Sequence, residues 1–159
     1  MKMRVGFGFD VHQLELGRKF VLGGVPVQHE KGCVAHSDGD VLIHAICDAL
    51  LGAASLGDIG VHFPDTSKEF KDVDSKQLLK STLGLIQEVG YHIGNIDSTI
   101  CLQRPKVKEY IPEMRQTLAN VLNMIPEDIG IKATTTEKLG YVGREEGISA
   151  YAVVLLYKE

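Results

Sequence analysis

The stretch SDGDVLIHAICDALLGAA, residues 37–54, decides the fold of this chain. It opens with Ser37 and Asp38, two residue types that cap the first turn of helices. The side chains that follow are apolar around almost the whole circumference of a helix, which predicts a buried helix. His44 lies in the middle of this segment, where an ionised ring would be costly. The rest of the chain must therefore supply layers that cover this helix.

Strand and helix patterns on both sides supply such layers. Residues 3–9 alternate small and apolar side chains, as expected of a first strand. A Gly-Gly bend interrupts the second strand and suits a hairpin, and Pro112 fits best in the first turn of its helix. The predicted elements besides the helix after Ser37 are strands over 3–9, 20–27, 93–103, 129–135 and 148–157, helices over 74–89 and 107–122, and a loop over 57–67.

This order of elements predicts an α+β sandwich in a single domain, with helices layered on one face of the sheet. A chain of 159 residues has the usual length of one domain. The last strand contains AYAVVLLY, residues 150–157, which is apolar on both faces. We therefore expect oligomerisation to cover the sheet face that the helices leave open.

Composition narrows the class of partner. The formal net charge of −4 argues against nucleic acid or an anionic membrane as a partner. The longest apolar stretch is too short to span a bilayer. The N-terminus runs straight into a strand pattern without a signal region, so we expect a cytoplasmic protein, or one of an organelle matrix if a transit peptide was trimmed. An odd set of three widely spaced cysteines fits a reducing compartment.

Asp10, His12 and His44 form the candidate metal site. Asp10 and His12 are two residues apart in a strand, so their side chains point to the same side. Three nitrogen and oxygen ligands with a fourth position open are typical of catalytic zinc. Asp40 and Asp48 each lie one helical turn from His44, and either would orient its ring.

Spacing alone leaves the role of these residues open. D-x-H is a weak pattern, and a single histidine in a helix is more often a hydrogen-bonded core residue than a ligand. Cys47 follows His44 by three residues and would share a helix face with it, but a small buried hydrophobic residue is the commoner role of such a cysteine.

Two further segments carry polar groups suited to an anionic ligand. KATTTEK, residues 132–138, offers hydroxyl and N–H groups at a strand end, and Glu137 would suit a second hard cation such as Mg²⁺. An edge strand of β-branched residues that runs into a turn would also explain the threonines, but explains Glu137 and Lys138 less well. GYVGREEG, residues 140–147, fits a mobile binding loop or a plain hairpin connection. The chain has no Walker-type phosphate loop.

Four motifs together carry a family resemblance. They are GFDVH (8–12), AHSDGDVLIHAICDALLGAASLGDIG (35–60), FPDT (63–66) and KATTTEKLGYVGREEGI (132–148). In this order they resemble the 2-C-methyl-D-erythritol 2,4-cyclodiphosphate synthase family, and the match runs from about residue 4 to residue 155.

The resemblance implies an enzyme of the non-mevalonate isoprenoid pathway, a phosphorus–oxygen lyase. Such an enzyme would convert 4-diphosphocytidyl-2-C-methyl-D-erythritol 2-phosphate to the cyclic diphosphate and release CMP. The implied fold is like that of the Bacillus chorismate mutase, with a mostly four-stranded mixed sheet. The implied assembly is a homotrimer with sheets packed around the threefold axis and active sites between subunits. An axial cavity near Arg144 and Glu146 would accept an isoprenoid diphosphate in some members.

The resemblance also implies roles for individual residues. Zinc, one per chain, would bind Asp10, His12 and His44, with Mn²⁺ or Co²⁺ as alternatives. Mg²⁺ or Mn²⁺ would bind Glu137 and the substrate diphosphate, while His36 and Thr135 would stabilise the transition state. The residues implied to contact substrate are Asp10, His12, His36, Ser37, Asp58, Ile59, Gly60, Phe63, Pro64, Asp65, Thr66, Ser67, Leu102, Gln103, Arg104, Pro105, Lys106, Val107, Lys108, Thr134, Thr135, Thr136, Glu137, Tyr141 and Arg144.

One stretch departs from the family pattern. Small residues are commoner in the family at the cytidine pocket, where this chain has Arg104 and Lys108.

Two other functions compete with the synthase. One is a zinc-dependent phosphohydrolase, and the other is a trimeric protein that binds isoprenoid diphosphates without catalysis.

Overall fold

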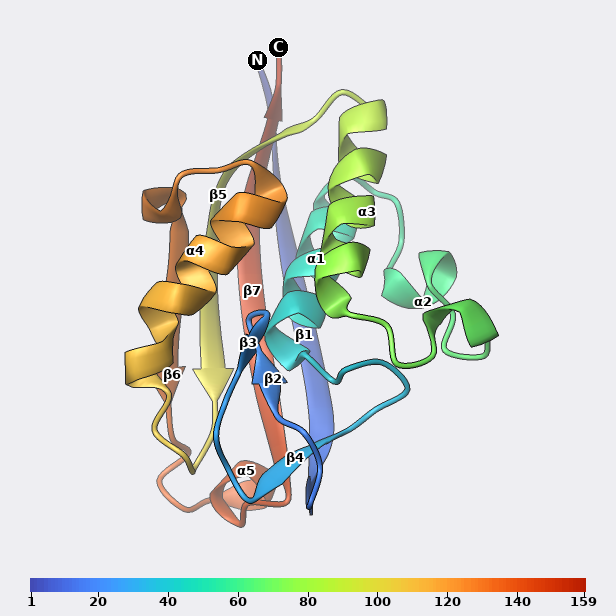
Figure 1. Cartoon of the computed structure of the whole chain (residues 1–159). Coiled ribbons are helices and arrows are strands. Elements are labelled where there is room, and N and C mark those ends of the chain that lie inside the picture. Colours follow the sequence, from blue (N-terminus) through green and yellow to red (C-terminus); the bar gives the residue numbers. More distant parts are fainter.

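Strand β1, Lys2–Leu16, runs the length of the molecule and organises the sheet (Figure 1). The computed structural model describes residues 1–159. The sheet has five strands in the order β4-β1-β7-β5-β6. Only β5 and β6 are parallel neighbours, so the sheet is mixed. Its strands are β1, β4 (Lys31–Val34), β5 (His92–Cys101), β6 (Ile129–Thr134) and β7 (Gly147–Lys158).

The expected α+β class is confirmed, but a mostly four-stranded sheet is wrong. The additional strand is β4, whose four residues are too few to show a periodic pattern. The expected strand over 20–27 is instead a separate small hairpin of β2 (Val21–Leu22) and β3 (Val25–Pro26), which turns at the two glycines. The first strand extends beyond Phe9, because β1 pairs with β7 as far as Gln13.

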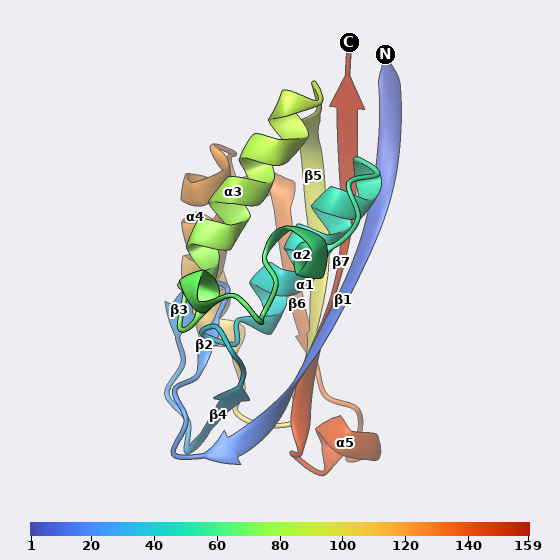
Figure 2. The same ribbon diagram turned by 90° about the vertical axis from the view of Figure 1, so that its right-hand side faces the viewer.

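The helices cover one face of the sheet, and Figure 2 shows the opposite face uncovered. The expected loop over 57–67 contains the short helix α2, and a second short helix, α5, lies in the glycine-rich segment near the C-terminus. None of the helices is long and apolar enough to cross a bilayer. The helices are α1 (Val41–Ala53), α2 (Ile59–His62), α3 (Ser75–Glu88), α4 (Ile111–Leu122) and α5 (Gly140–Gly143), with 3₁₀ turns η1 (Lys68–Phe70), η2 (Lys108–Tyr110) and η3 (Pro126–Asp128).

Helix α1 is the buried helix predicted from the sequence, although its cap is Asp40 rather than Ser37 or Asp38. The Asp40 carboxylate is completely buried and accepts hydrogen bonds from the backbone N–H groups of Gly23, Gly24 and Ile43. It therefore caps α1 and fixes the β2–β3 hairpin to it. Buried N–H groups need an acceptor, which explains why a position that water does not reach carries an aspartate.

The uncovered face of the sheet is apolar along β1 and β7. The odd-numbered side chains of β1 point to it, and Phe7 is 63% exposed. On the neighbouring strand β7, Val153 pairs with Phe7 and Tyr151 pairs with Phe9. The exposed apolar side chains of these two strands are Met3, Val5, Phe7, Phe9, Val11, Tyr151 and Val153, and we call them the open face. A continuous apolar surface of this kind marks an interaction site.

Candidate metal and substrate site

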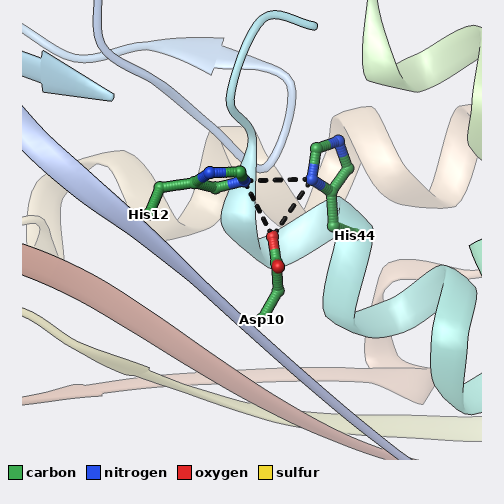
Figure 3. A group of neighbouring side chains, drawn as sticks. All are labelled: Asp10, His12 and His44. Carbon is green, nitrogen blue, oxygen red and sulfur yellow. Dashed lines mark hydrogen bonds and ion pairs between the residues drawn. The ribbon is translucent and has the colours of Figure 1, made fainter. Parts of the chain in front are cut away.

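The candidate metal site lies where β1 passes under α1. Asp10 and His12 point to the same side of β1, as their spacing predicted, and His44 projects from α1 toward them (Figure 3). Asp10 Oδ2 lies 2.9 Å from His12 Nε2 and 3.1 Å from His44 Nδ1. The two ring nitrogens are 3.2 Å apart.

This donor set fits a zinc ion. Zinc bonds of about 2.0–2.1 Å in a tetrahedron place ligand atoms roughly 3.3 Å apart, close to the three separations in this cluster. One carboxylate and two imidazoles are ordinary zinc ligands, and three of them leave one position for an exogenous group. The structure thus brings together all three residues that the sequence predicted as ligands.

The electrostatics of the cluster keep the Asp10 carboxylate ionised and tie it to both rings. Burial alone would raise the pKa of Asp10, but hydrogen bonds from His12 and His44 outweigh it and lower this pKa to about 2. Burial acts to lower the pKa of His44, yet the hydrogen bond to Asp10 makes the net shift upward. A metal ion bound at this cluster would take the place of the protons that form these hydrogen bonds.

The residues that support His44 differ from those expected. Asp40 holds backbone N–H groups, and Asp48 accepts from the N–H of Ile59, so neither carboxylate bonds to the ring. Instead, His44 Nε2 lies 2.9 Å from the hydroxyl of Ser75. Ser75 is 31 residues away in the sequence, so no local spacing could have indicated it.

A cavity of about 290 Å³ opens in front of the metal site. Phe70, Val73 and Leu78 form part of its wall and were not predicted, because a plain apolar pattern does not distinguish a cavity wall from a core. Asp58 does not line it, because its carboxylate accepts the N–H of Val61 at the start of α2. The predicted residues that line it are Asp10, His12, His36, Ser37, His44, Ile59, Gly60, Phe63 and Asp65, whereas Pro64, Thr66 and Ser67 do not.

A second cavity, of about 240 Å³, lies beside the ends of β5 and β6. Arg104 does not line it, because its guanidinium is turned to Glu145 at 2.7 Å and Glu30 at 3.6 Å. Thr136, Glu137, Tyr141 and Arg144 also lie outside its wall. The predicted residues that line it are Leu102, Gln103, Pro105, Lys106, Val107, Lys108, Thr134 and Thr135.

Comparison with known proteins decides the family. The model of the YgbB family matches residues 3–157. A 2-C-methyl-D-erythritol 2,4-cyclodiphosphate synthase of Bacteroides fragilis is 65% identical over 156 residues, which are 98% of each chain. The enzyme of the same name from Bacteroides thetaiotaomicron is 63% identical over the full length of both chains.

The chain belongs to the 2-C-methyl-D-erythritol 2,4-cyclodiphosphate synthase family.

Solved structures of the synthase family share the fold. The bifunctional IspDF of Campylobacter jejuni superimposes with a TM-score of 0.96 at 43% identity, and the match covers 99% of this chain and 43% of that one. A Plasmodium falciparum IspF in complex with CDP gives a TM-score of 0.87 at 32% identity, covering 99% of this chain and 97% of that one.

The two cavities of this synthase-family chain are separate. No residue lines both of them. One row of strand pairing joins Asp10 to Ala150, Ala150 to Ile100, and Ile100 to Ala133. The metal site and the second cavity thus lie at the same level of the sheet but three strand spacings apart, roughly 14 Å.

Cys47 is not part of the metal site. It is completely buried, and burial raises the pKa of its thiol to about 12. Its surroundings are the apolar core, and it is absent from the cluster of metal-binding groups. The role of a small buried hydrophobic residue is therefore confirmed for Cys47.

Proposed function

We propose that this chain is a cyclodiphosphate synthase that converts 4-diphosphocytidyl-2-C-methyl-D-erythritol 2-phosphate to 2-C-methyl-D-erythritol 2,4-cyclodiphosphate and CMP. Family membership at 65% identity over 98% of the chain supports the activity. The observation that carries it within the structure is the three-residue donor set at the mouth of a cavity. A site of this kind suits a substrate rich in phosphate oxygens.

The reaction is an intramolecular displacement at phosphorus. An oxygen of the 2-phosphate forms a new bond to the β-phosphorus, and the bond from that phosphorus to the oxygen bridging to the α-phosphate breaks. CMP leaves with that electron pair. The attacking phosphate oxygen is already nucleophilic, so the chain need not provide a strong general base. Its task is to hold the two phosphates in line and to neutralise their charge.

Two cations would supply much of that neutralisation: zinc held by Asp10, His12 and His44, and Mg²⁺ held by Glu137 with the substrate diphosphate. Mn²⁺ or Co²⁺ would serve as alternatives to zinc. The side chains proposed to stabilise the transition state are His36, in the wall of the metal-site cavity, and Thr135, in the wall of the second cavity. The His36 ring nitrogen lies 3.2 Å from the carbonyl oxygen of Ser67, which ties the ring to the loop 63–67, the segment proposed to hold the methylerythritol phosphate.

The second cavity is the proposed cytidine site. The IspF of Plasmodium falciparum was solved as a CDP complex, which supports a nucleotide ligand for this fold. Lys106 and Lys108 are in the cavity wall and offer positive charge to a diphosphate. Thr134 contributes a hydroxyl group from the end of β6.

A complete site requires more than one copy of the chain. The metal site and the cytidine cavity are separated by β7 and β5 within one chain. The open face of β1 and β7 supplies an apolar surface for association. We therefore place the active sites between subunits of a homotrimer of chorismate mutase type, with the open faces around the axis. Arg144, paired with Glu146 at 2.9 Å, is the candidate to bind an isoprenoid diphosphate there.

Product analysis tests this function. The purified protein is incubated with the cytidyl substrate and Mg²⁺, and the products are followed by phosphorus NMR. The expected products are CMP and a cyclic diphosphate. A linear phosphate that has incorporated oxygen from labelled water would show a phosphohydrolase instead. His44→Ala is expected to abolish turnover, and an unchanged rate in that variant would contradict the role of the metal site.

A further inference from the structure

The side of the His44 ring that faces away from the metal position carries a second, organised set of contacts. Nδ1 faces Asp10, and Nε2 faces the start of α3. There it lies 2.9 Å from Ser75 Oγ and 3.3 Å from Ser37 Oγ. Ser75 is completely buried, so this hydroxyl is shielded from solvent.

The contacts continue from Ser75 to Asp38. Ser75 Oγ donates its hydrogen to Asp38 Oδ1 at 2.5 Å. An ionised carboxylate can only accept, so the serine hydrogen is committed to Asp38 and the serine oxygen remains as an acceptor. Asp38 is itself fixed, because it accepts the backbone N–H groups of Ser75 at 2.9 Å and Asp40 at 3.1 Å.

This direction of hydrogen bonding sets the tautomer of His44. If Ser75 Oγ accepts, His44 Nε2 must carry the hydrogen, and in the neutral ring that binds a metal ion Nδ1 keeps its lone pair. We propose that Ser75 and Asp38 are positioning residues, which hold the His44 ring with its hydrogen on Nε2 and its Nδ1 lone pair directed at the metal ion. This inference deepens the metal assignment of the proposed function and depends on it.

A purely structural role does not account for the position of the Ser75 hydroxyl. Asp74 already caps α3 by accepting the N–H of Lys76 at 2.9 Å. Backbone bonds from Asp38 N to Val73 O and from Asp72 N to His36 O already join the two loops. The hydroxyl is therefore needed neither to start the helix nor to connect the segments, and its remaining partner is the His44 ring.

Ser37 provides a matched control. Its hydroxyl is farther from His44 Nε2, at 3.3 Å, and already accepts the N–H of Gly39. Both serines lie on the same side of the ring, so each can be changed to alanine with the same loss of atoms. Of the two serines, only Ser75 connects the ring to the Asp38 carboxylate.

The test measures zinc affinity by competition with a chelator of known affinity, on wild type, Ser75→Ala, Asp38→Asn and Ser37→Ala. We expect Ser75→Ala to weaken zinc binding by roughly 10- to 100-fold, the usual effect of losing a group that orients a ligand. Asp38→Asn loses one acceptor and should weaken zinc binding less than Ser75→Ala does. Ser37→Ala should bind zinc as wild type does. Melting curves of the zinc-free proteins establish that each variant is folded.

Histidine-selective ¹⁵N NMR of the zinc-loaded proteins gives a second readout. Wild type should show a slowly exchanging Nε2–H proton on His44, and Ser75→Ala should lose it. Wild-type affinity together with a retained proton signal in Ser75→Ala would overturn the positioning role alone. A wild-type protein that binds no zinc would overturn the metal assignment and the positioning role together. If Ser75→Ala does not fold, the same two measurements on Asp38→Asn decide, and wild-type values there overturn the inference.

Discussion

Gly8 of β1 lies directly beneath Ala45 of α1: a Cβ atom on Gly8 would lie 1.9 Å from the Ala45 carbonyl oxygen. One turn further along, Gly6 has the same relation to Ala49. Real side chains do not approach this closely, so α1 can rest on β1 only where β1 has glycine. This close contact places His44 within 3.1 Å of Asp10.

Gly8→Ala should therefore damage both stability and the metal site. The added methyl group meets backbone, which cannot give way, so α1 must move outward. We expect a loss of roughly 1–3 kcal/mol in the free energy of unfolding, measured by urea denaturation, together with weaker zinc binding. Gly84→Ala in α3 is the control, because a Cβ there meets nothing within 4 Å. Removing a glycine from that helix should stabilise by about 0.5–1 kcal/mol, and equal effects of the two substitutions would contradict a close contact between α1 and β1.

Asp40→Ala should destabilise the chain more than the loss of an ordinary helix cap. It leaves the N–H groups of Gly23, Gly24 and Ile43 without their acceptor in a completely buried place. We expect a cost of roughly 2–4 kcal/mol in the free energy of unfolding. Asp74→Ala removes an exposed cap of α3 and should cost about 1 kcal/mol. A similar small cost for both variants would show that the hairpin is not fixed through Asp40.

Phe7→Asp should break the proposed trimer. Phe7 is 63% exposed in the middle of the open face, where a subunit interface would bury the new charge. Sedimentation is expected to show monomers for this variant and trimers for wild type, and the monomer should lack activity. Ile125→Asp changes another exposed apolar residue, which lies outside the open face, and should remain trimeric. A trimeric, active Phe7→Asp protein would argue against association through this face.

Lys106→Ala and Arg104→Ala should differ in their effect on the KM of the cytidyl substrate. Lys106 lines the second cavity, and losing a charged hydrogen-bond donor to a phosphate costs roughly 1.5–3 kcal/mol, or about 10- to 100-fold in KM. Arg104 is paired with Glu145 at 2.7 Å and lies outside the cavity wall, so its replacement should raise KM less. Steady-state kinetics decide, and a larger effect of Arg104 would show that its side chain turns toward the substrate.

Much of the fold follows from patterns that are local in the sequence. The apolar run after Asp40 identified α1, and the spacing of Asp10 and His12 placed both side chains on one side of β1. Short elements could not be predicted in this way. Helices α2 and α5 have four residues each, too few for a helical period to appear.

The site residues, too, could be predicted only where local patterns or motifs point to them. The three candidate metal ligands could be predicted, because two of them share a strand, the third is a polar exception in a buried helix, and the family resemblance assigns all three to zinc. The support from Ser75 and Asp38 was missed, because it depends on the packing of α3 beside α1 rather than on any spacing. The position of Arg104 was equally hidden, since its partners Glu30 and Glu145 are distant in sequence.

The separation of the metal site from the second cavity along the strand row from Asp10 to Ala133 has a consequence for mixtures of two variants. If each subunit gives its metal ligands to one active site and its Glu137 to another, then one defective residue disables only one of the two sites that its chain serves. Two inactive proteins, His44→Ala and Glu137→Ala, should therefore complement each other when refolded together. Every mixed ring of three then contains one interface with both halves intact, and random mixing in equal amounts would restore roughly a quarter of the sites.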